Sequence, residues 1–201
     1  MYTLPDQLVG WVKSVSDNKY EEILSVSASL INKKDYVGVS LQEVANKVGL
    51  HKSTLFHYIR SKEDLLVQIF DKSPGEVSEN LEKITSDASL KPEEKLKNAI
   101  HNHISLLVKN FDYANIFLNQ VTRLPKKNQA TFLKQRKKYE KNFEKIVREM
   151  KTKGYFKKLD GKIVTFALLG MLNWLPKWYK RRGPLTVKDL SNVFYKLIVE
   201  K

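Results

Sequence analysis

Residues 40–66 read SLQEVANKVGLHKSTLFHYIRSKEDLL, and the spacing within this stretch predicts two short helices joined by a tight turn. Ser40 and Glu43 form a capping box, in which the serine hydroxyl accepts from the third helical amide and the glutamate reaches back to the serine amide. Apolar residues follow at helical spacing, and Gly49 permits the left-handed backbone of a tight turn. A second helix is predicted at about residues 51–58. The stretch therefore has the geometry of a helix-turn-helix, whose second helix enters the major groove of DNA.

The rest of the chain also carries the apolar spacing and the capping signals of helices, without any long β-alternation. Pro176 should bend one of these helices, because proline removes an amide donor and clashes with the preceding turn. The sequence predicts an all-α fold of about nine helices. Outside the opening stretch, helical patterns cover residues 20–34, 61–86, 92–111, 114–122, 128–153 and 162–180, with a last helix after Thr186.

The composition supports a folded helical protein without disulfides. The chain has 201 residues, of which 42% are hydrophobic, and glycine (8) and proline (6) are scarce. It has no cysteine, which excludes a disulfide framework and a thiolate zinc site. No apolar run reaches the length of a membrane span, and the first residues lack the pattern of a secretion signal. We therefore expect a soluble, cytoplasmic protein that does not bind membranes.

The charge of the chain favours a polyanionic partner, with nucleic acid first. The formal net charge is +14. Residues 1–60 carry 7 basic and 6 acidic side chains, whereas residues 123–158 carry 14 basic and 3 acidic ones. The excess positive charge is thus far in sequence from the helix-turn-helix, so it serves another purpose or none.

The segment at 41–66 closely resembles the DNA-binding segment of TetR-family transcriptional regulators, and the likeness is strong over residues 19–70. The resemblance implies an all-α homodimer that binds double-stranded operator DNA and a small-molecule effector, without a cofactor or a metal. It implies an N-terminal three-helix helix-turn-helix DNA-binding domain over residues 1–60, with an extension at 1–16. A C-terminal helical ligand-binding and dimerisation domain would then cover residues 61–201.

Seven residues match positions that contact DNA in this family: Gln42, Lys52, Ser53, Thr54, His57, Tyr58 and Lys62. Their chemistry agrees, because Lys52 can donate to guanine, Gln42 can bind adenine through two hydrogen bonds, and hydroxyls suit phosphates. The sequence departs from the family pattern at three positions. His51 stands where serine or threonine is usual and should weaken the helix cap, Phe56 replaces a common tyrosine, and Asp35 replaces a common glycine.

A second informative stretch, GMLNWLPKWYKRRGPL at residues 170–185, resembles a C-terminal motif of TetR-family regulators that sense acyl-CoA thioesters, including regulators of fatty-acid and steroid degradation. The resemblance implies an effector with an apolar tail and a polyanionic head. Such a head suits lysine and arginine, and an acyl chain suits an apolar tunnel. The ligand-binding residues expected on this basis are Leu107, Phe111, Phe117, Val121, Phe166, Asn173, Trp174, Trp178 and Arg181.

Other interpretations of the second half stay open. Trp174 and Trp178 could instead belong to the dimer interface, because the last two long helices of this family form a four-helix bundle between subunits. The lysine-rich stretch at 134–141 suits a solvated helix face. His101 and His103 suit structural or exposed positions, with ligand contact as the less favoured alternative.

We therefore expect a ligand-responsive transcriptional repressor whose effector is an acyl-CoA thioester, although activation is not excluded by the sequence. One alternative keeps the fold and senses another hydrophobic ligand or drug, which would need no phosphate-binding cations. Another is a non-specific nucleic-acid or anionic-membrane binder that uses residues 123–158. An enzyme is not expected, because the sequence has no paired carboxylates, nucleophile triad, metal cluster or glycine-rich phosphate loop.

Overall fold

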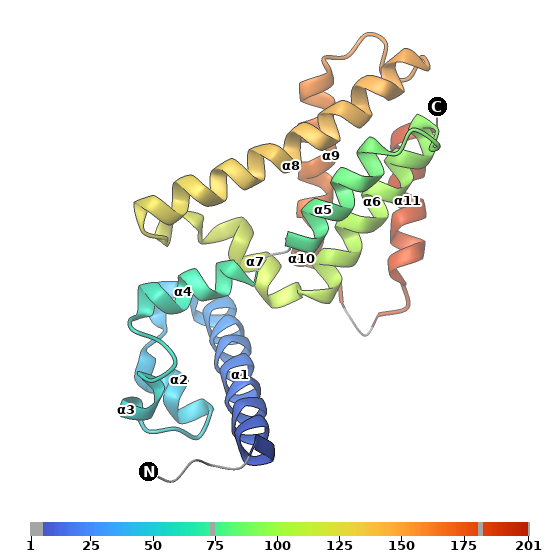
Figure 1. The fold of residues 1–201 in the computed structure, drawn as a ribbon. Helices are drawn as coiled ribbons and strands as arrows, with labels where there is room; N and C mark the ends of the chain where they lie inside the picture. The colour runs from blue at the N-terminus through green and yellow to red at the C-terminus, as the bar shows by residue number, and fades with distance from the viewer. Residues whose placement is uncertain (1–5, 73–74, 181–182, 201) are drawn as a thin grey trace.

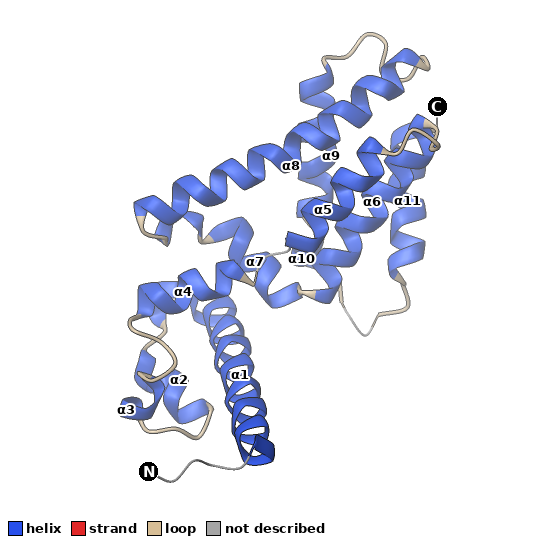
Figure 2. Ribbon diagram, in the orientation of Figure 1, coloured by secondary structure: helices blue, strands red, loops and turns tan. Residues whose placement is uncertain are grey.

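The computed structural model describes residues 6–72, 75–180 and 183–200, and every regular element in these ranges is helical, as Figure 2 shows. The all-α expectation is confirmed. None of the described helices combines the length and the apolar character that crossing a membrane requires. The predicted extension at 1–16 lies partly outside the described residues, and Figure 1 traces the remainder as the start of a long first helix.

The N-terminal part consists of α1 (Asp6–Gly38), α2 (Leu41–Lys47) and α3 (Lys52–Leu55), with α4 (Lys62–Asp71) across one end of α1 (Figure 1). These four helices share one hydrophobic core. It includes Ile23, Leu24, Val44, Leu55, Leu66 and Ile69, each with no exposed surface. The core therefore continues past the predicted domain boundary at residue 60, because the apolar face of α4 closes it.

The start of α2 and the turn between α2 and α3 form for the expected reasons. The Ser40 hydroxyl accepts a hydrogen bond from the Glu43 amide at 3.1 Å, which satisfies a free donor of the first turn. Gly49 has φ 69°, in the left-handed region that a tight turn requires. The expected return bond from Glu43 to Ser40 is replaced, however, because the Glu43 carboxylate pairs with Lys34 at 2.6 Å.

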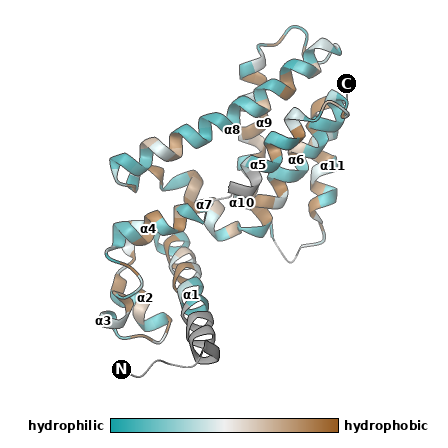
Figure 3. Cartoon of the chain, in the orientation of Figure 1, coloured by the Kyte–Doolittle hydropathy of each residue, from teal (hydrophilic) through white to brown (hydrophobic). Residues whose placement is uncertain are grey.

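The C-terminal part is a stack of helices around α6 (Pro92–Lys109), which contacts α5 (Gly75–Ser86), α8 (Lys126–Thr152) and α11 (Val187–Val199). The helix α9 (Gly161–Asn173) packs against both α6 and α8. A second hydrophobic core forms where these helices meet, and it contains Leu96, Ile100, Phe143, Ile146 and Leu172. Figure 3 shows that α8 is hydrophilic along most of its length, in keeping with its lysine-rich sequence.

Two short elements complete the fold. The predicted helix at 162–180 is interrupted, because α9 ends at Asn173 and α10 (Leu175–Trp178) adds only one turn. Pro176 lies in that turn, so the predicted bend is confirmed. Between α6 and α8 lie α7 (Phe111–Asn119) and a turn of 3₁₀ helix, η1 (Val121–Arg123).

The two parts are joined by apolar packing, because Ile116 of α7 and Leu124 belong to the first core, and by polar contacts between α1 and α7. The Asn32 side-chain amide donates to the Asp112 carbonyl oxygen at 2.9 Å, and Asn115 donates to the Asn32 oxygen at 2.8 Å. At the kink of α1, Asp35 has φ 64° and ψ 160°, and its carboxylate accepts a hydrogen bond from Gln120 at 2.7 Å. The non-glycine residue at this strained position is therefore held by a bond that also ties α1 to the end of α7.

Candidate functional site

The exposed side of α3 presents most of the predicted DNA-contacting residues. Lys52, Ser53 and His57 are exposed, and Thr54 is half-buried. Leu55, on the opposite side, has no exposed surface and anchors the helix in the first core. The α-helical part is only one turn long, and residues 56–58 continue it as a turn. His51 occupies the N-cap without a side-chain hydrogen bond, so the expected weak cap is confirmed.

The other three predicted DNA-contacting residues make contacts inside the chain. The Gln42 amide donates to Asn46 at 2.9 Å on the exposed side of α2. Tyr58 is half-buried and packs against the first core. The Lys62 ammonium donates to the Val37 carbonyl oxygen at 3.2 Å and lies 4.5 Å from the centre of the Tyr36 ring. Because an ammonium group carries three donors, Lys62 can keep this bond and still reach a phosphate.

A cavity of about 520 Å³ lies deeper in the molecule, where α4 to α9 meet. Its size falls within the range of small-molecule sites. Phe70, at the end of α4, forms part of one wall and makes edge contacts with Phe117 at 5.1 Å and Phe132 at 4.9 Å between ring centres. The apolar wall consists of Phe70, Leu106, Leu107, Ala114, Phe117, Leu118, Phe132 and Leu169.

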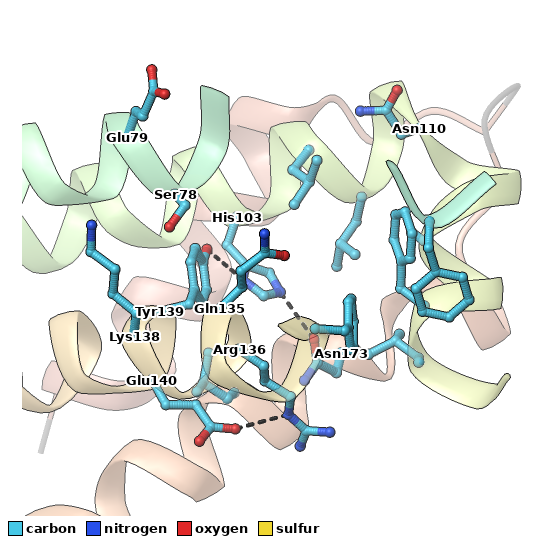
Figure 4. Close-up of a pocket in the computed structure, with 18 of the residues that line it drawn as sticks. Ser78, Glu79, His103, Asn110, Gln135, Arg136, Lys138, Tyr139, Glu140 and Asn173 are labelled. Carbon is cyan, nitrogen blue, oxygen red and sulfur yellow. Dashed lines mark hydrogen bonds and ion pairs between the residues drawn. The ribbon is translucent and has the colours of Figure 1, made fainter. Parts of the chain in front are cut away.

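Three polar side chains form a hydrogen-bonded row in the cavity, from Tyr139 through His103 to Asn173 (Figure 4). The Tyr139 hydroxyl lies 3.0 Å from His103 Nδ1, and His103 Nε2 lies 3.2 Å from the Asn173 side-chain oxygen. The Asn173 oxygen can only accept, so Nε2 carries the hydrogen, Nδ1 accepts, and the tyrosine hydroxyl donates. Burial lowers the pKa of His103 to about 4, against a smaller opposing effect of the Asn173 hydrogen bond, so the ring is neutral at pH 7.

Charged side chains lie along the cavity on α4, α5 and α8. Arg136 pairs with Glu140 at 2.9 Å, and Lys138 pairs with Glu82 at 2.8 Å. Asp71 and Glu79 add two carboxylates to the lining. Figure 4 shows Lys138 and Glu79 on the side of the cavity where Tyr139 lies, and Arg136 with Glu140 below the row.

The structure brings together some of the predicted effector-binding residues. Leu107, Phe117 and Asn173 line the cavity, whereas Phe111 and Val121 are half-buried outside its lining. Phe166, Trp174 and Trp178 also do not line the cavity, because they point to the surface with 48%, 62% and 44% of their area exposed. Arg181 lies outside the described residues.

The sequence favoured a structural or exposed position for His103 over ligand contact, and it did not single out Tyr139. His103 is 5% exposed and sits in the buried stripe of α6, one turn before Leu107. A histidine in that mainly apolar stripe, which also contains Lys95, was the available signal. Tyr139 gave none, because its surroundings in sequence are mostly charged.

A second feature of the C-terminal part is an exposed apolar side of α9, which we call the α9 face. It consists of Ile163, Phe166, Met171 and Trp174, which recur at helical spacing. Ile163 and Trp174 have 68% and 62% of their surface exposed. On α11, Val193 and Leu197 are likewise exposed, at 51% and 69%. Exposed apolar surface of this kind is typical of a protein–protein interface.

Comparison with known proteins identifies both parts of the chain. Residues 23–69 match the family described as bacterial regulatory proteins, tetR family. Residues 89–201 match the tetracyclin repressor-like C-terminal domain.

Individual proteins give a consistent result. The chain is 30% identical over 97 residues to the fatty acid metabolism regulator protein of Bacillus subtilis (strain 168). These residues cover 48% of this chain and 49% of that protein, so the match spans about half of that relative. It is 19% identical over 197 residues, 96% of each chain, to the HTH-type transcriptional repressor KstR2 of Mycobacterium tuberculosis (strain CDC 1551 / Oshkosh). The solved structure of AibR in complex with isovaleryl coenzyme A and operator DNA is similar with a TM-score of 0.76 and 27% identity, covering 90% of this chain and 97% of AibR.

Proposed function

Because the chain belongs to the TetR family of bacterial regulatory proteins, we propose that it is a homodimeric repressor that leaves its operator when it binds an acyl-CoA thioester. Membership of this family makes the chain a DNA-binding transcriptional regulator and not an enzyme. The repressor direction is supported by its likeness to KstR2, which is named a repressor.

The DNA-binding part of the proposal rests on the exposed side of α3. Lys52, Ser53 and His57 have no part in the core and face solvent, so they are free to meet base edges and phosphates. Gln42, Thr54, Tyr58 and Lys62 complete the proposed contact set. Two such helices in a dimer would read successive major grooves of a near-palindromic operator.

The homodimer is supported by the α9 face and by the exposed apolar residues of α11. An isologous interface would bury both against a second copy of the same surface. Trp174→Glu would place a charge at the C-terminal end of the α9 face and should yield a monomer in light scattering after size-exclusion chromatography. If Trp174→Glu keeps the mass of the wild type, the interface lies elsewhere.

The observation that carries the effector proposal is the cavity, which combines an apolar wall with charged side chains from α4, α5 and α8. That arrangement suits a ligand with an apolar tail and a polar head. AibR, at 27% identity, was solved with isovaleryl coenzyme A, and the Bacillus relative is a fatty acid metabolism regulator. Arg136 and Lys138 on α8 are the cations placed to meet a phosphate, and the wider basic stretch of α8 would attract the head group.

The helix α4 supplies a route from the cavity to DNA. Its first residue, Lys62, is a proposed phosphate contact, and its last residues, Phe70 and Asp71, line the cavity. A ligand that displaces Phe70 therefore shifts the helix that carries Lys62. If the liganded dimer prefers another separation of its two α3 helices, operator affinity falls by population shift.

The test is thermal unfolding with CoA, with butyryl-, octanoyl- and palmitoyl-CoA, with free fatty acids and with cationic dyes. A ligand that binds only the folded state raises the melting temperature by mass action. We expect a shift with one or more acyl-CoAs that exceeds the shift with CoA or the free acid, and release of operator DNA by the same compound. A shift with dyes and none with thioesters would refute the acyl-CoA effector and leave the regulator.

One observation favours a second candidate, a sensor of cationic hydrophobic compounds. Asp71 and Glu79 line the cavity, and the two cations on α8 are already paired with Glu140 and Glu82. A cationic ligand would meet these carboxylates without displacing an ion pair. The dye samples in the same experiment separate this candidate from the first.

A further inference from the structure

The Tyr139–His103–Asn173 row is unusual because it lies against apolar wall and carries no charge. Leu107 and Leu169 line the same cavity beside it. Apolar contacts can hold an acyl chain, but they cannot fix its position along the cavity. A buried polar group can do so, because leaving it without a partner costs free energy.

The hydrogen bonds within the row leave a defined set of groups for a ligand. Both ring nitrogens of His103 are occupied, and the Tyr139 proton and one lone pair of the Asn173 oxygen are used. The Asn173 amide nitrogen has no hydrogen-bond partner among the described residues and is not one of the fully enclosed unpaired atoms. It therefore offers two N–H donors at the cavity, and the Tyr139 oxygen can still accept.

The row also disfavours an anion. A charged histidine would attract a carboxylate, but burial keeps His103 neutral at pH 7. The same cavity is lined by three carboxylates, of Asp71, Glu79 and Glu140, and by only two cations, Arg136 and Lys138, each of which is already paired with a glutamate. The group that suits the row is an uncharged oxygen that accepts a hydrogen bond.

We propose that the Asn173 amide, held in place by His103 and Tyr139, binds an uncharged oxygen of the effector, a carbonyl or a hydroxyl. The proposal rests on the acyl-CoA function proposed above. In such a ligand the oxygen is the thioester carbonyl or a hydroxyl on the acyl chain. Such a contact would let the cavity distinguish a thioester from the corresponding free acid.

Three probes of matched chain length distinguish these sources: octanoyl-CoA, octyl-CoA, in which a CH₂ group replaces the carbonyl, and β-hydroxyoctanoyl-CoA. Their dissociation constants are measured by calorimetry on the intact protein. Loss of one hydrogen bond to a buried donor should weaken binding on the order of tenfold to a hundredfold. Tighter binding of octanoyl-CoA than of octyl-CoA by this factor identifies the thioester carbonyl. Equal binding of these two, with tighter binding of β-hydroxyoctanoyl-CoA, identifies a chain hydroxyl.

Two variants connect the preference to the row. Asn173→Leu removes the donor, and Asn173→Asp keeps the oxygen that accepts from His103 but removes the amide hydrogens. Both should abolish the preference, whereas Asn98→Leu, the same exchange on the exposed side of α6, should keep it. Circular dichroism and operator binding check that each variant is folded. If Asn173→Leu does not fold, Asn173→Asp alone tests the role of the amide.

The experiment distinguishes refutation of the role of the row from refutation of the acyl-CoA effector. Equal binding of all three probes, or a preference that survives both Asn173 variants, overturns the role of the row while the acyl-CoA effector stands. Failure of every CoA thioester to bind the wild type overturns both proposals.

Discussion

The buried, neutral His103 should make the stability of the protein fall between neutral pH and about pH 4. Burial lowers the pKa of this histidine from 6.5 to about 4 in the folded state. As the pH falls below 6.5 the unfolded chain binds a proton at this residue and the folded chain does not, so protonation stabilises the unfolded state relative to the folded one. The loss ends once the pH reaches the folded pKa, below which both states are protonated.

The size of the effect follows from the shift in pKa. At 1.36 kcal/mol for each pKa unit, His103 should remove about 3 kcal/mol from the free energy of unfolding across this range. That is a large part of a total that is about 5–15 kcal/mol for most proteins. The carboxylates of the chain titrate in the same range, so the wild-type curve alone does not isolate the histidine.

The measurement is therefore a comparison of urea unfolding curves at several pH values for the wild type and for His103→Gln. The glutamine can still donate to the Asn173 oxygen, and it does not titrate. We expect its free energy of unfolding to fall about 3 kcal/mol less than that of the wild type between neutral pH and about pH 4. His57→Gln, on the exposed side of α3, is the control. If wild type and His103→Gln lose stability in parallel, the histidine is not buried in its neutral form.

Three further predictions concern other sites. Asp35→Gly should be more stable than Asp35→Ala by about 1 kcal/mol and should therefore melt at a higher temperature, because both lose the same hydrogen bonds but only glycine fits the positive φ. Equal melting temperatures would contradict backbone strain at Asp35. Lys52→Ala should weaken operator binding by about 1–3 kcal/mol in a gel-shift titration and leave the melting temperature unchanged, whereas Lys97→Ala, far from α3, should alter neither. Lys95→Met should lower the free energy of unfolding, measured with urea, by about 3 kcal/mol, because it leaves Glu149 without its ion-pair partner at 2.9 Å. A decrease below about 1 kcal/mol would show that solvent replaces the ion pair.

Much of the fold was predictable because its signals are local. Ser40, Gly49 and Pro176 each act on the turn in which they stand, and each does so in the structure. The pairing of Glu43 with Lys34 could not be predicted in this way, because it depends on how α1 packs against α2.

The candidate sites likewise divide into features with local signals and features that depend on how the helices pack. The exposed side of α3 could be predicted because core and surface positions alternate along a single helix. The cavity could not be predicted, because its side chains come from six helices whose relative positions the sequence does not reveal. Asn173 was identified from a resemblance, but its hydrogen bond to His103, 70 positions away, exists only in the folded chain.

The position of α4 constrains how this protein can change during evolution. The same ten residues begin at a proposed phosphate contact and end in the wall of the cavity. A substitution at Phe70 that admits a new ligand would also alter the packing of α4, whose first residue is the proposed phosphate contact Lys62. Selection for a new effector would therefore have to be followed by compensating changes near α3, and ligand specificity and operator affinity would not evolve as independent traits.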